Sequence, residues 1–278
     1  MDTPGRTDPR AWSLGTATSL FRTPGPAEFQ ACAQAGLSDI ELDLFGHGLD
    51  AATAAGEAGC AALARQIRAA GLRLWSVHLP FGGRWDISVA DPAARRWALQ
   101  EQARLLQAAG AWGAGVAVVH ASAEPVTPQE RAPRLARAAD ALAELAGTAV
   151  GAGLRLAVEC LPRTCLGNCG QEIAALLGPP GLAVCCDVNH LFRETPAAFV
   201  AALGPHLATL HISDNDGLDE RHWLPGRGVI AWPELLEALA AAGYAGPFLF
   251  EVNPLPPAEL AATWQALLPA WAARRAPA

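Results

Sequence analysis

The sequence predicts an α/β protein, a single (β/α)8 TIM barrel that spans residues 1–278. Short apolar segments alternate with longer Ala-rich segments, and this alternation repeats eight times, at about 35 residues a unit. Strands that alternate with helices pair in parallel, and eight such units close most simply into a barrel. No linker or shift in composition divides the chain, so we expect one domain.

The strands are predicted from short apolar segments that end at turn residues. Segment 38–45 shows the pattern, because apolar and acidic residues alternate along it, and Pro80 closes segment 72–79. We expect strands at 12–20 (where the strand runs into a loop), 38–45, 72–79, 115–120, 154–160, 182–187, 207–212 and 247–252.

A helix signal follows each predicted strand. Asp91 suits the N-cap of one helix and Pro92 its first turn, and Thr127 with Pro128 opens the next. Glycine marks helix ends, as Gly36 does for the first helix. We expect helices at 26–35, 51–70, 91–109, 127–150, 171–177, 196–203, 233–242 and 257–273.

Composition narrows the class of protein. Hydrophobic residues make up 51% of the chain and charged residues 17%, which suits a large core and few disordered tails. The net charge of −7 argues against a polyanionic partner, so we expect no nucleic acid. The start lacks a signal-peptide core, and no apolar stretch is long enough to span a membrane. Seven scattered cysteines favour reduced thiols in the cytoplasm.

Metal-competent side chains stand at the carboxyl ends of the predicted strands, from the third strand to the eighth. Active sites of such barrels lie at this end of the strands. A lone histidine in a core is more often a hydrogen-bonded structural residue. A buried carboxylate, however, is costly unless it is paired or bound to a metal. The residues concerned are His78, His120, Glu159, Asp187, His190, His211 and Glu251.

Glu159, Asp187, His211 and Glu251 form the predicted ligand set for a divalent metal ion. Three carboxylates and one imidazole make a hard, anionic site that suits Mn²⁺, Mg²⁺, Co²⁺ or Zn²⁺. Further imidazoles favour Zn²⁺ or a centre with more than one ion. The residues predicted to bind either substrate or an additional ion are His78, His120, His190, Glu220 and His222.

Four motifs in the second half of the chain carry a resemblance to a known family. They are A-V-E-C at Glu159, D-V-N-H from Asp187 to His190, L-H-I-S-D-N-D-G at His211, and P-G-R-G-V-I-A-W followed by F-L-F-E-V at Glu251. With S-V-H-L-P-F and V-V-H at the third and fourth strands, they extend over nearly the whole chain. The sequence resembles the xylose isomerase-like TIM-barrel superfamily, in particular its sugar phosphate isomerase/epimerase group.

The resemblance implies that Glu159, Asp187, His211 and Glu251 bind one divalent ion. It also implies that the two glutamates are the acid/base pair of an isomerase or epimerase acting on a sugar, sugar phosphate or keto acid. One would remove the proton beside the carbonyl, and the other would return a proton to the opposite face of an enediolate. The expected partner is a small polyhydroxylated carbonyl compound, and a homo-oligomer remains open.

Substrate contacts are expected from loops at the same end of the barrel. The resemblance assigns His190 to a hydroxyl or carbonyl group of the substrate. Arg221 or Arg227 would hold a distal hydroxyl, carboxylate or phosphate group. Trp85 and Trp223 lie in predicted loops and are candidates for aromatic walls against a sugar ring.

Three alternative functions remain open. A dehydratase of the same superfamily, of the inosose or dehydroshikimate type, would begin with the same proton abstraction. An apurinic-site endonuclease with three zinc ions would use Glu220 and His222 as further ligands, although those enzymes carry Asp at the position of Glu220. The net charge of −7 and the lack of a basic stretch argue against that phosphodiesterase. A non-catalytic sugar-binding barrel would not need two opposed carboxylates on a metal.

On the second predicted strand, the acidic residues Glu41 and Asp43 alternate with apolar neighbours. Residues two apart lie on the same face of a strand. We therefore expect one or both of them to face the barrel interior and contact a metal ligand without binding the ion.

Overall fold

The computed structural model describes residues 5–178 and 181–274. Within them, parallel strands form one eight-stranded sheet in the order β7-β6-β5-β4-β3-β2-β1-β8. A parallel bridge between Ile212 and Phe250 joins the two ends of that order and closes the barrel, so the predicted fold class is confirmed. The strands are β1 (Leu14–Ala17), β2 (Asp39–Asp43), β3 (Arg73–His78), β4 (Val116–Val119), β5 (Arg155–Glu159), β6 (Leu182–Asp187), β7 (Leu207–His211) and β8 (Phe248–Phe250).

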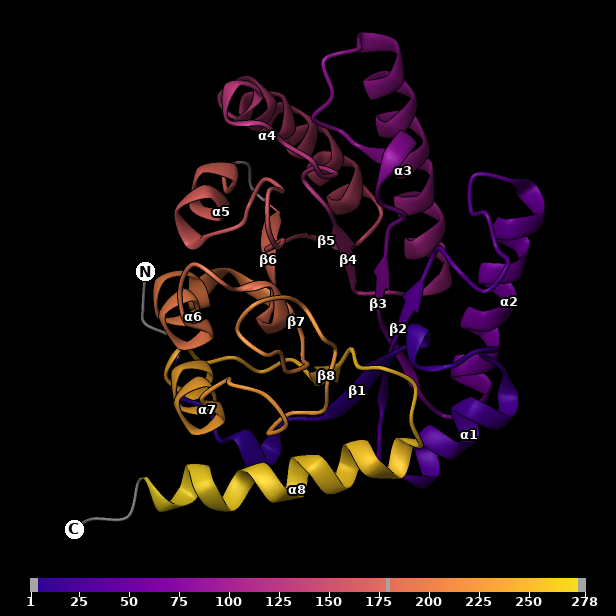
Figure 1. Ribbon diagram of the computed structural model, residues 1–278. Helices are drawn as coiled ribbons and strands as arrows, with labels where there is room; N and C mark the ends of the chain where they lie inside the picture. Colours follow the sequence, from indigo (N-terminus) through magenta and orange to yellow (C-terminus); the bar gives the residue numbers. More distant parts are fainter. Residues whose placement is uncertain (1–4, 179–180, 275–278) are drawn as a thin grey trace.

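An α-helix follows each strand, and the helices surround the barrel (Figure 1). None of the helices within 5–178 and 181–274 is both long enough and apolar enough to cross a membrane. The helices are α1 (Pro26–Gln34), α2 (Ala54–Ala69), α3 (Pro92–Trp112), α4 (Pro128–Gly151), α5 (Gly170–Leu176), α6 (Pro196–Leu203), α7 (Trp232–Ala241) and α8 (Pro257–Ala273).

Local signals explain where several elements begin and end. The strand predicted at 12–20 stops at Ala17, because the chain turns into a 3-10 helix at Thr18–Leu20. Helix α3 continues past the predicted end to Trp112, and Gly113 then terminates it in the left-handed conformation, with φ of 88°. The last strand is shorter than the predicted 247–252, since only Phe248–Phe250 pairs with β1.

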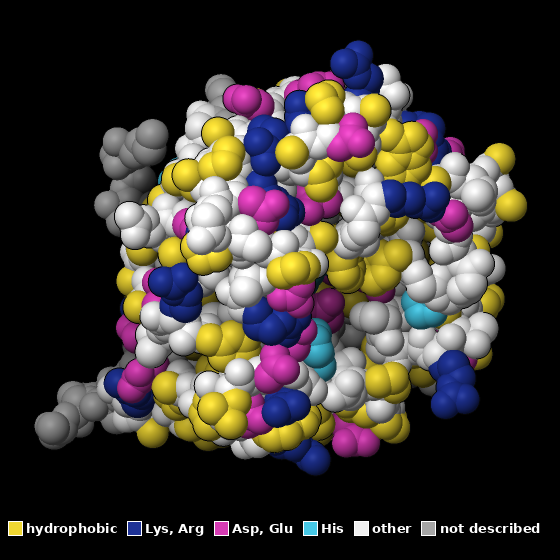
Figure 2. All heavy atoms as spheres, turned by 45° about the horizontal axis from the view of Figure 1, so that its top comes forward, with side chains coloured by type: hydrophobic (Ala, Val, Ile, Leu, Met, Phe, Trp, Pro, Cys, Tyr) yellow, Lys and Arg dark blue, Asp and Glu magenta, His cyan; other side chains and the backbone are white. Residues whose placement is uncertain are grey.

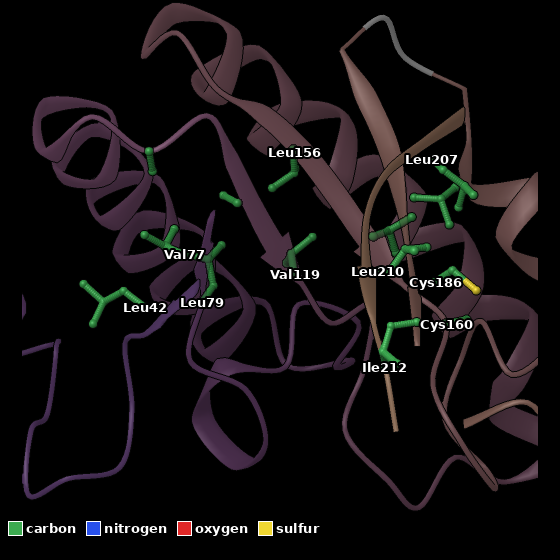
Figure 3. Close-up of a cluster of buried hydrophobic side chains, with 14 of the residues drawn as sticks. Leu42, Val77, Leu79, Val119, Leu156, Cys160, Cys186, Leu207, Leu210 and Ile212 are labelled. Carbon is green, nitrogen blue, oxygen red and sulfur yellow. The ribbon is translucent and has the colours of Figure 1, made fainter. Parts of the chain in front are cut away.

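Side chains alternate across the strands and build two apolar layers. On β4, Ala117 and Val119 join the layer between strands and helices, whereas Val116 and Val118 face the barrel interior. The outer layer is the larger one, and Figure 3 shows part of it. Each Leu or Val buried there contributes roughly 1.5–3 kcal/mol. The interior layer consists of Val116, Val118, Ala157, Ala183, Cys185 and Ala208, with Trp75 packed against it.

The barrel interior changes from apolar to polar towards the carboxyl ends of the strands. Ala157 of β5 belongs to the interior apolar layer, and Glu159 lies two residues further along the same face. Cys185 and Asp187 have the same relationship on β6. The apolar layer therefore lies beneath the acidic side chains and supports them.

Candidate functional site

Four side chains meet at the carboxyl ends of β5 to β8. Glu159, Asp187 and His211 are the last residues of β5, β6 and β7, and Glu251 directly follows β8. Each offers one ligand atom, and these four atoms lie within 4.8 Å of one another. The first three side chains are buried, and Glu251 is 17% exposed. The barrel thus brings the four predicted ligands together at one point.

Glu159 lies at the centre of this group. Its Oε2 is 3.0 Å from Nε2 of His78 and 2.9 Å from Nε2 of His120. Its Oε1 is 3.0 Å from Nδ1 of His211, so the two oxygens face different sets of nitrogen atoms. Burial alone would raise the pKa of Glu159, but the imidazoles of His211 and His120 outweigh it and hold this pKa well below its usual range.

Two carboxylate oxygens beside Glu159, Oδ2 of Asp187 and Oε2 of Glu251, have no hydrogen-bond partner among the residues described. Burial is the main reason that the pKa of each of these two carboxyl groups is raised. A buried polar atom without a partner is costly, and a divalent cation would satisfy both oxygens. Carboxylate oxygen and imidazole nitrogen are donors that Mn²⁺, Mg²⁺, Co²⁺ and Zn²⁺ accept. The residues present therefore fit a divalent ion.

The ring of His211 also contacts a second carboxylate, inside the barrel. Nε2 of His211 is 2.8 Å from Oε1 of Glu41, although the two atoms are not aligned as a hydrogen bond. The other oxygen of Glu41 accepts a hydrogen bond of 2.7 Å from Ser76. Asp43 is also buried, and its Oδ2 accepts hydrogen bonds from Thr18 and from the backbone of Ser19. Of Glu41 and Asp43, Glu41 is thus the one that contacts a candidate ligand.

A second group of ligand-type side chains, His190, Glu220 and His222, lies beside the first. One ligand atom from each lies within 4.8 Å of the others, and Nε2 of His190 is 2.8 Å from Oε2 of Glu220. Nδ1 of His190 is 3.2 Å from Oδ2 of Asp187, which connects the two groups. Two imidazoles and one carboxylate suit Zn²⁺. This group is more exposed than the first, since Glu220 is 26% and His222 33% exposed.

A cavity of about 380 Å³ opens above both groups. Figure 2 shows acidic and histidine side chains around a hollow in the surface. This volume lies in the range of sites for small molecules. The predicted site residues that line the cavity are His78, His120, Glu159, His190, Glu220, His222 and Glu251.

The four residues predicted only as substrate contacts do not line this cavity. Arg221 is exposed and its Nε donates a hydrogen bond of 2.7 Å to Asp216, and Arg227 is exposed on the loop beyond it. Trp85 is buried and its ring packs against a tryptophan of α3. Trp223 is 38% exposed, and its backbone pairs with that of Asp214 in the loop after β7. Their geometry gives no support to the predicted substrate contacts.

Several residues without a predicted role also line the cavity, among them Phe45, Phe81 and Arg163. The ring of Phe81 stacks on His120 with 4.2 Å between centroids, and Phe45 packs edge-on against both Phe81 and His78. Phe45 and Phe81 follow the ends of β2 and β3 closely, which is a usable signal. Arg163 carries no such signal, because nothing in its local sequence separates it from the other arginines.

Proteins of known sequence and structure resemble this chain. Fructoselysine 3-epimerase of Escherichia coli O157:H7 is 31% identical over 117 residues, which cover 40% of this chain and 42% of that protein. Fructoselysine 3-epimerase of Shigella flexneri matches to the same extent. The chain therefore spans about two fifths of the length of these relatives.

Solved structures share the fold over nearly the whole chain at low sequence identity. A D-tagatose 3-epimerase-like protein superposes with a TM-score of 0.80 at 20% identity, over 95% of this chain and 100% of that one. D-Allulose 3-epimerase from Methylomonas sp., in complex with D-allulose, gives a TM-score of 0.75 at 19% identity, over 96% and 99%. Residues 29–269 match the family described as the xylose isomerase-like TIM barrel, and the chain belongs to that family.

Proposed function

We propose that this protein is a divalent-metal-dependent sugar epimerase or isomerase, which shifts a proton beside the carbonyl group of a small polyhydroxylated substrate. The observation that carries the proposal is the approach of four ligand atoms, from Glu159, Asp187, His211 and Glu251, to within 4.8 Å of one another beneath a sugar-sized cavity. The relatives named as sugar 3-epimerases support the same class of reaction. We expect the protein to act in the cytoplasm, where its thiols stay reduced.

The metal would be held by Glu159, Asp187, His211 and Glu251. When bound, a divalent ion supplies positive charge that stabilises the oxygen atoms of an enediolate and lowers the pKa of the neighbouring C–H group. Asp187 and His211 have no further task in the proposal, because their buried position leaves them out of the cavity lining.

Glu159 and Glu251 are the proposed acid/base pair. Both line the cavity, one from the end of β5 and the other from the end of β8, so they approach a bound sugar from different directions. One carboxylate takes the proton from the carbon beside the carbonyl, and the electron pair of that C–H bond forms the enediolate. The other carboxyl group delivers a proton to the opposite face, which restores the carbonyl with inverted configuration.

The histidines around the pair would orient the substrate. His120 and His190 line the cavity on two sides of Glu159, and an imidazole can donate to or accept from a hydroxyl or carbonyl group. Phe45 and Phe81 supply an apolar wall against the carbon face of a sugar. The cavity therefore offers both the polar and the apolar contacts that a ketose needs.

Solvent-deuterium exchange into a panel of ketoses and keto acids tests this proposal. Glu159→Gln and Glu251→Gln should each abolish exchange, while the variants keep part of their bound metal. Glu144→Gln, at an exposed site on α4, removes the same charge away from the cavity and should leave exchange unchanged. Exchange that persists in both glutamine variants of the site would sink the acid/base assignment.

The same measurement separates the alternatives that share the first step. A dehydratase would take up deuterium and then lose water, giving a product with a new absorbance, whereas a sugar-binding barrel would bind the ketose without any exchange. One further observation favours a multi-zinc phosphodiesterase, namely the second group formed by His190, Glu220 and His222. The net charge of −7 opposes contact with a phosphodiester backbone. Nicking of abasic DNA at nanomolar enzyme would place that activity first.

A further inference from the structure

An ion-pair cluster borders the cavity and is centred on Arg163. Nε and Nη2 of Arg163 donate to Glu124 at 2.7–3.1 Å, and Nη1 donates to Asp219 at 2.9 Å and to Glu220 at 2.7 Å. Arg163 follows β5, Glu124 follows β4, and the two other carboxylates follow β7. The cluster therefore joins three loops that border the entrance to the site.

The backbone of Arg163 is fixed for this role. Its φ of 49° lies in the left-handed region, which costs a non-glycine residue free energy and persists only where surrounding contacts hold it. Asn168 supplies such a contact, since its Nδ2 donates a hydrogen bond of 2.6 Å to the carbonyl oxygen of Arg163. The backbone conformation of Arg163 therefore holds its guanidinium group at the entrance.

The charge balance of the cluster is negative. Arg163 is the one Arg or Lys among the described residues that line the cavity, and all of its nitrogen atoms are already directed at carboxylates. Three carboxylates against one guanidinium leave a net charge of about −2 at ordinary pH, and of about −1 when His190, which lies 2.8 Å from Glu220, is counted as a cation. Arg221 and Arg227 do not line the cavity and cannot offset this excess.

We propose that Arg163, Glu124, Asp219 and Glu220 determine the charge of the substrate, so that the entrance admits an uncharged ketose and excludes its phosphate ester. A phosphate group entering here would meet net negative charge, and taking over Arg163 would strip two or three carboxylates of their partner. An uncharged hydroxyl meets no such penalty, because carboxylates accept hydrogen bonds from hydroxyl groups. This inference rests on the proposed function, since it names the substrate class of the same site.

Calorimetric titration with D-fructose, D-fructose 6-phosphate and inorganic phosphate tests the inference. We expect the wild-type protein to bind D-fructose at least about tenfold more tightly than its phosphate ester, and to bind inorganic phosphate negligibly. The double variant Glu124→Gln with Asp219→Asn should gain at least about tenfold in affinity for both anions, since it frees part of Arg163. Adding Arg163→Gln to that variant should remove the gain.

A matched control carries the same change in net charge. Glu28→Gln with Glu259→Gln, on α1 and α8 and outside the cavity lining, should leave all three affinities as in the wild type. The inference is overturned if the wild type prefers the phosphate ester, or if the entrance double variant gains no more phosphate affinity than the control. The inorganic phosphate arm gives this answer even where D-fructose is not the sugar that the site accepts.

Deuterium exchange distinguishes failure of this inference from failure of the proposed function. If exchange into a phosphorylated ketose exceeds exchange into its parent sugar, the inference about substrate charge is wrong but the proposed isomerase function stands. If the entrance variant gains phosphate affinity but no ketose undergoes exchange, the inference about substrate charge stands and the proposed isomerase function is wrong.

Discussion

Two parts of the cavity carry charged side chains: the floor, formed by Glu159, Asp187, His211 and Glu251, and the entrance, formed by Arg163 and its carboxylate partners. The floor residues lie at strand ends, whereas the entrance residues lie in loops. At the floor, Glu159 ends a central strand, is 1% exposed and contacts three imidazoles. At the entrance, Arg163 lies in a loop, its side chain is 39% exposed and its partners are carboxylates from other loops. Buried charges interact strongly because water does not screen them, whereas exposed pairs contribute little to stability. The floor is thus suited to hold an ion and do chemistry, and the entrance to select what reaches it.

Removing a candidate ligand at the floor should have the largest effect on metal binding. Asp187→Asn keeps the shape of the side chain but loses an anionic oxygen that has no hydrogen-bond partner among the described residues, so Mn²⁺ affinity should fall by more than about 100-fold. Asp219→Asn makes the same change at the entrance and should alter this affinity little. Calorimetric titration with Mn²⁺ compares the two variants, and equal losses in both would erase the distinction between floor and entrance.

Changing the carboxylate behind His211 should have an intermediate effect. Glu41→Gln removes the negative charge that lies 2.8 Å from Nε2 of His211, so Mn²⁺ affinity should fall about 10–100-fold. The ¹⁵N signals of the His211 ring should shift as well, which loss of packing elsewhere would not produce. Ser76→Ala leaves the carboxylate in place and should cost less. An unchanged affinity with unchanged ring signals in Glu41→Gln would show that Glu41 has no part in holding His211.

Breaking the entrance cluster should have the smallest effect on stability. Arg163→Gln removes ion pairs whose side chains are more than a quarter exposed, so the free energy of unfolding should fall by no more than about 1 kcal/mol. Urea denaturation measures this change, and the wild-type advantage should shrink further in high salt. A loss of several kcal/mol would contradict this account, because it would show that the entrance ion pairs contribute strongly to the stability of the fold.

Sequence reasoning succeeded where the barrel itself fixes a side chain. Glu159, Asp187 and His211 end strands, and the closed sheet leaves little freedom in where a strand-end residue lies. Each of the eight strands lies within its predicted segment, but all except β6 are shorter than predicted, because strand ends depend on the turns and on pairing with neighbours. Periodicity along one segment contains no such information.

Loop residues show the limit of that reasoning. Arg221 was expected at the substrate because it follows β7, yet it pairs with Asp216 and does not line the cavity. Arg163 lines the cavity but has no predicted role, since its position depends on contacts with two loops distant in sequence. The side-chain direction of a loop residue is decided by tertiary contacts, which a local pattern does not contain.

Chelation tests the central claim most directly. The protein would be incubated with EDTA, dialysed, and assayed for solvent-deuterium exchange into a ketose that the untreated protein exchanges, before and after Mn²⁺ or Zn²⁺ is added back. The account predicts that exchange disappears with the metal and returns with it. Exchange that continues at the full rate in the chelated protein, with metal analysis finding no divalent ion, would contradict a metal centre formed by Glu159, Asp187, His211 and Glu251.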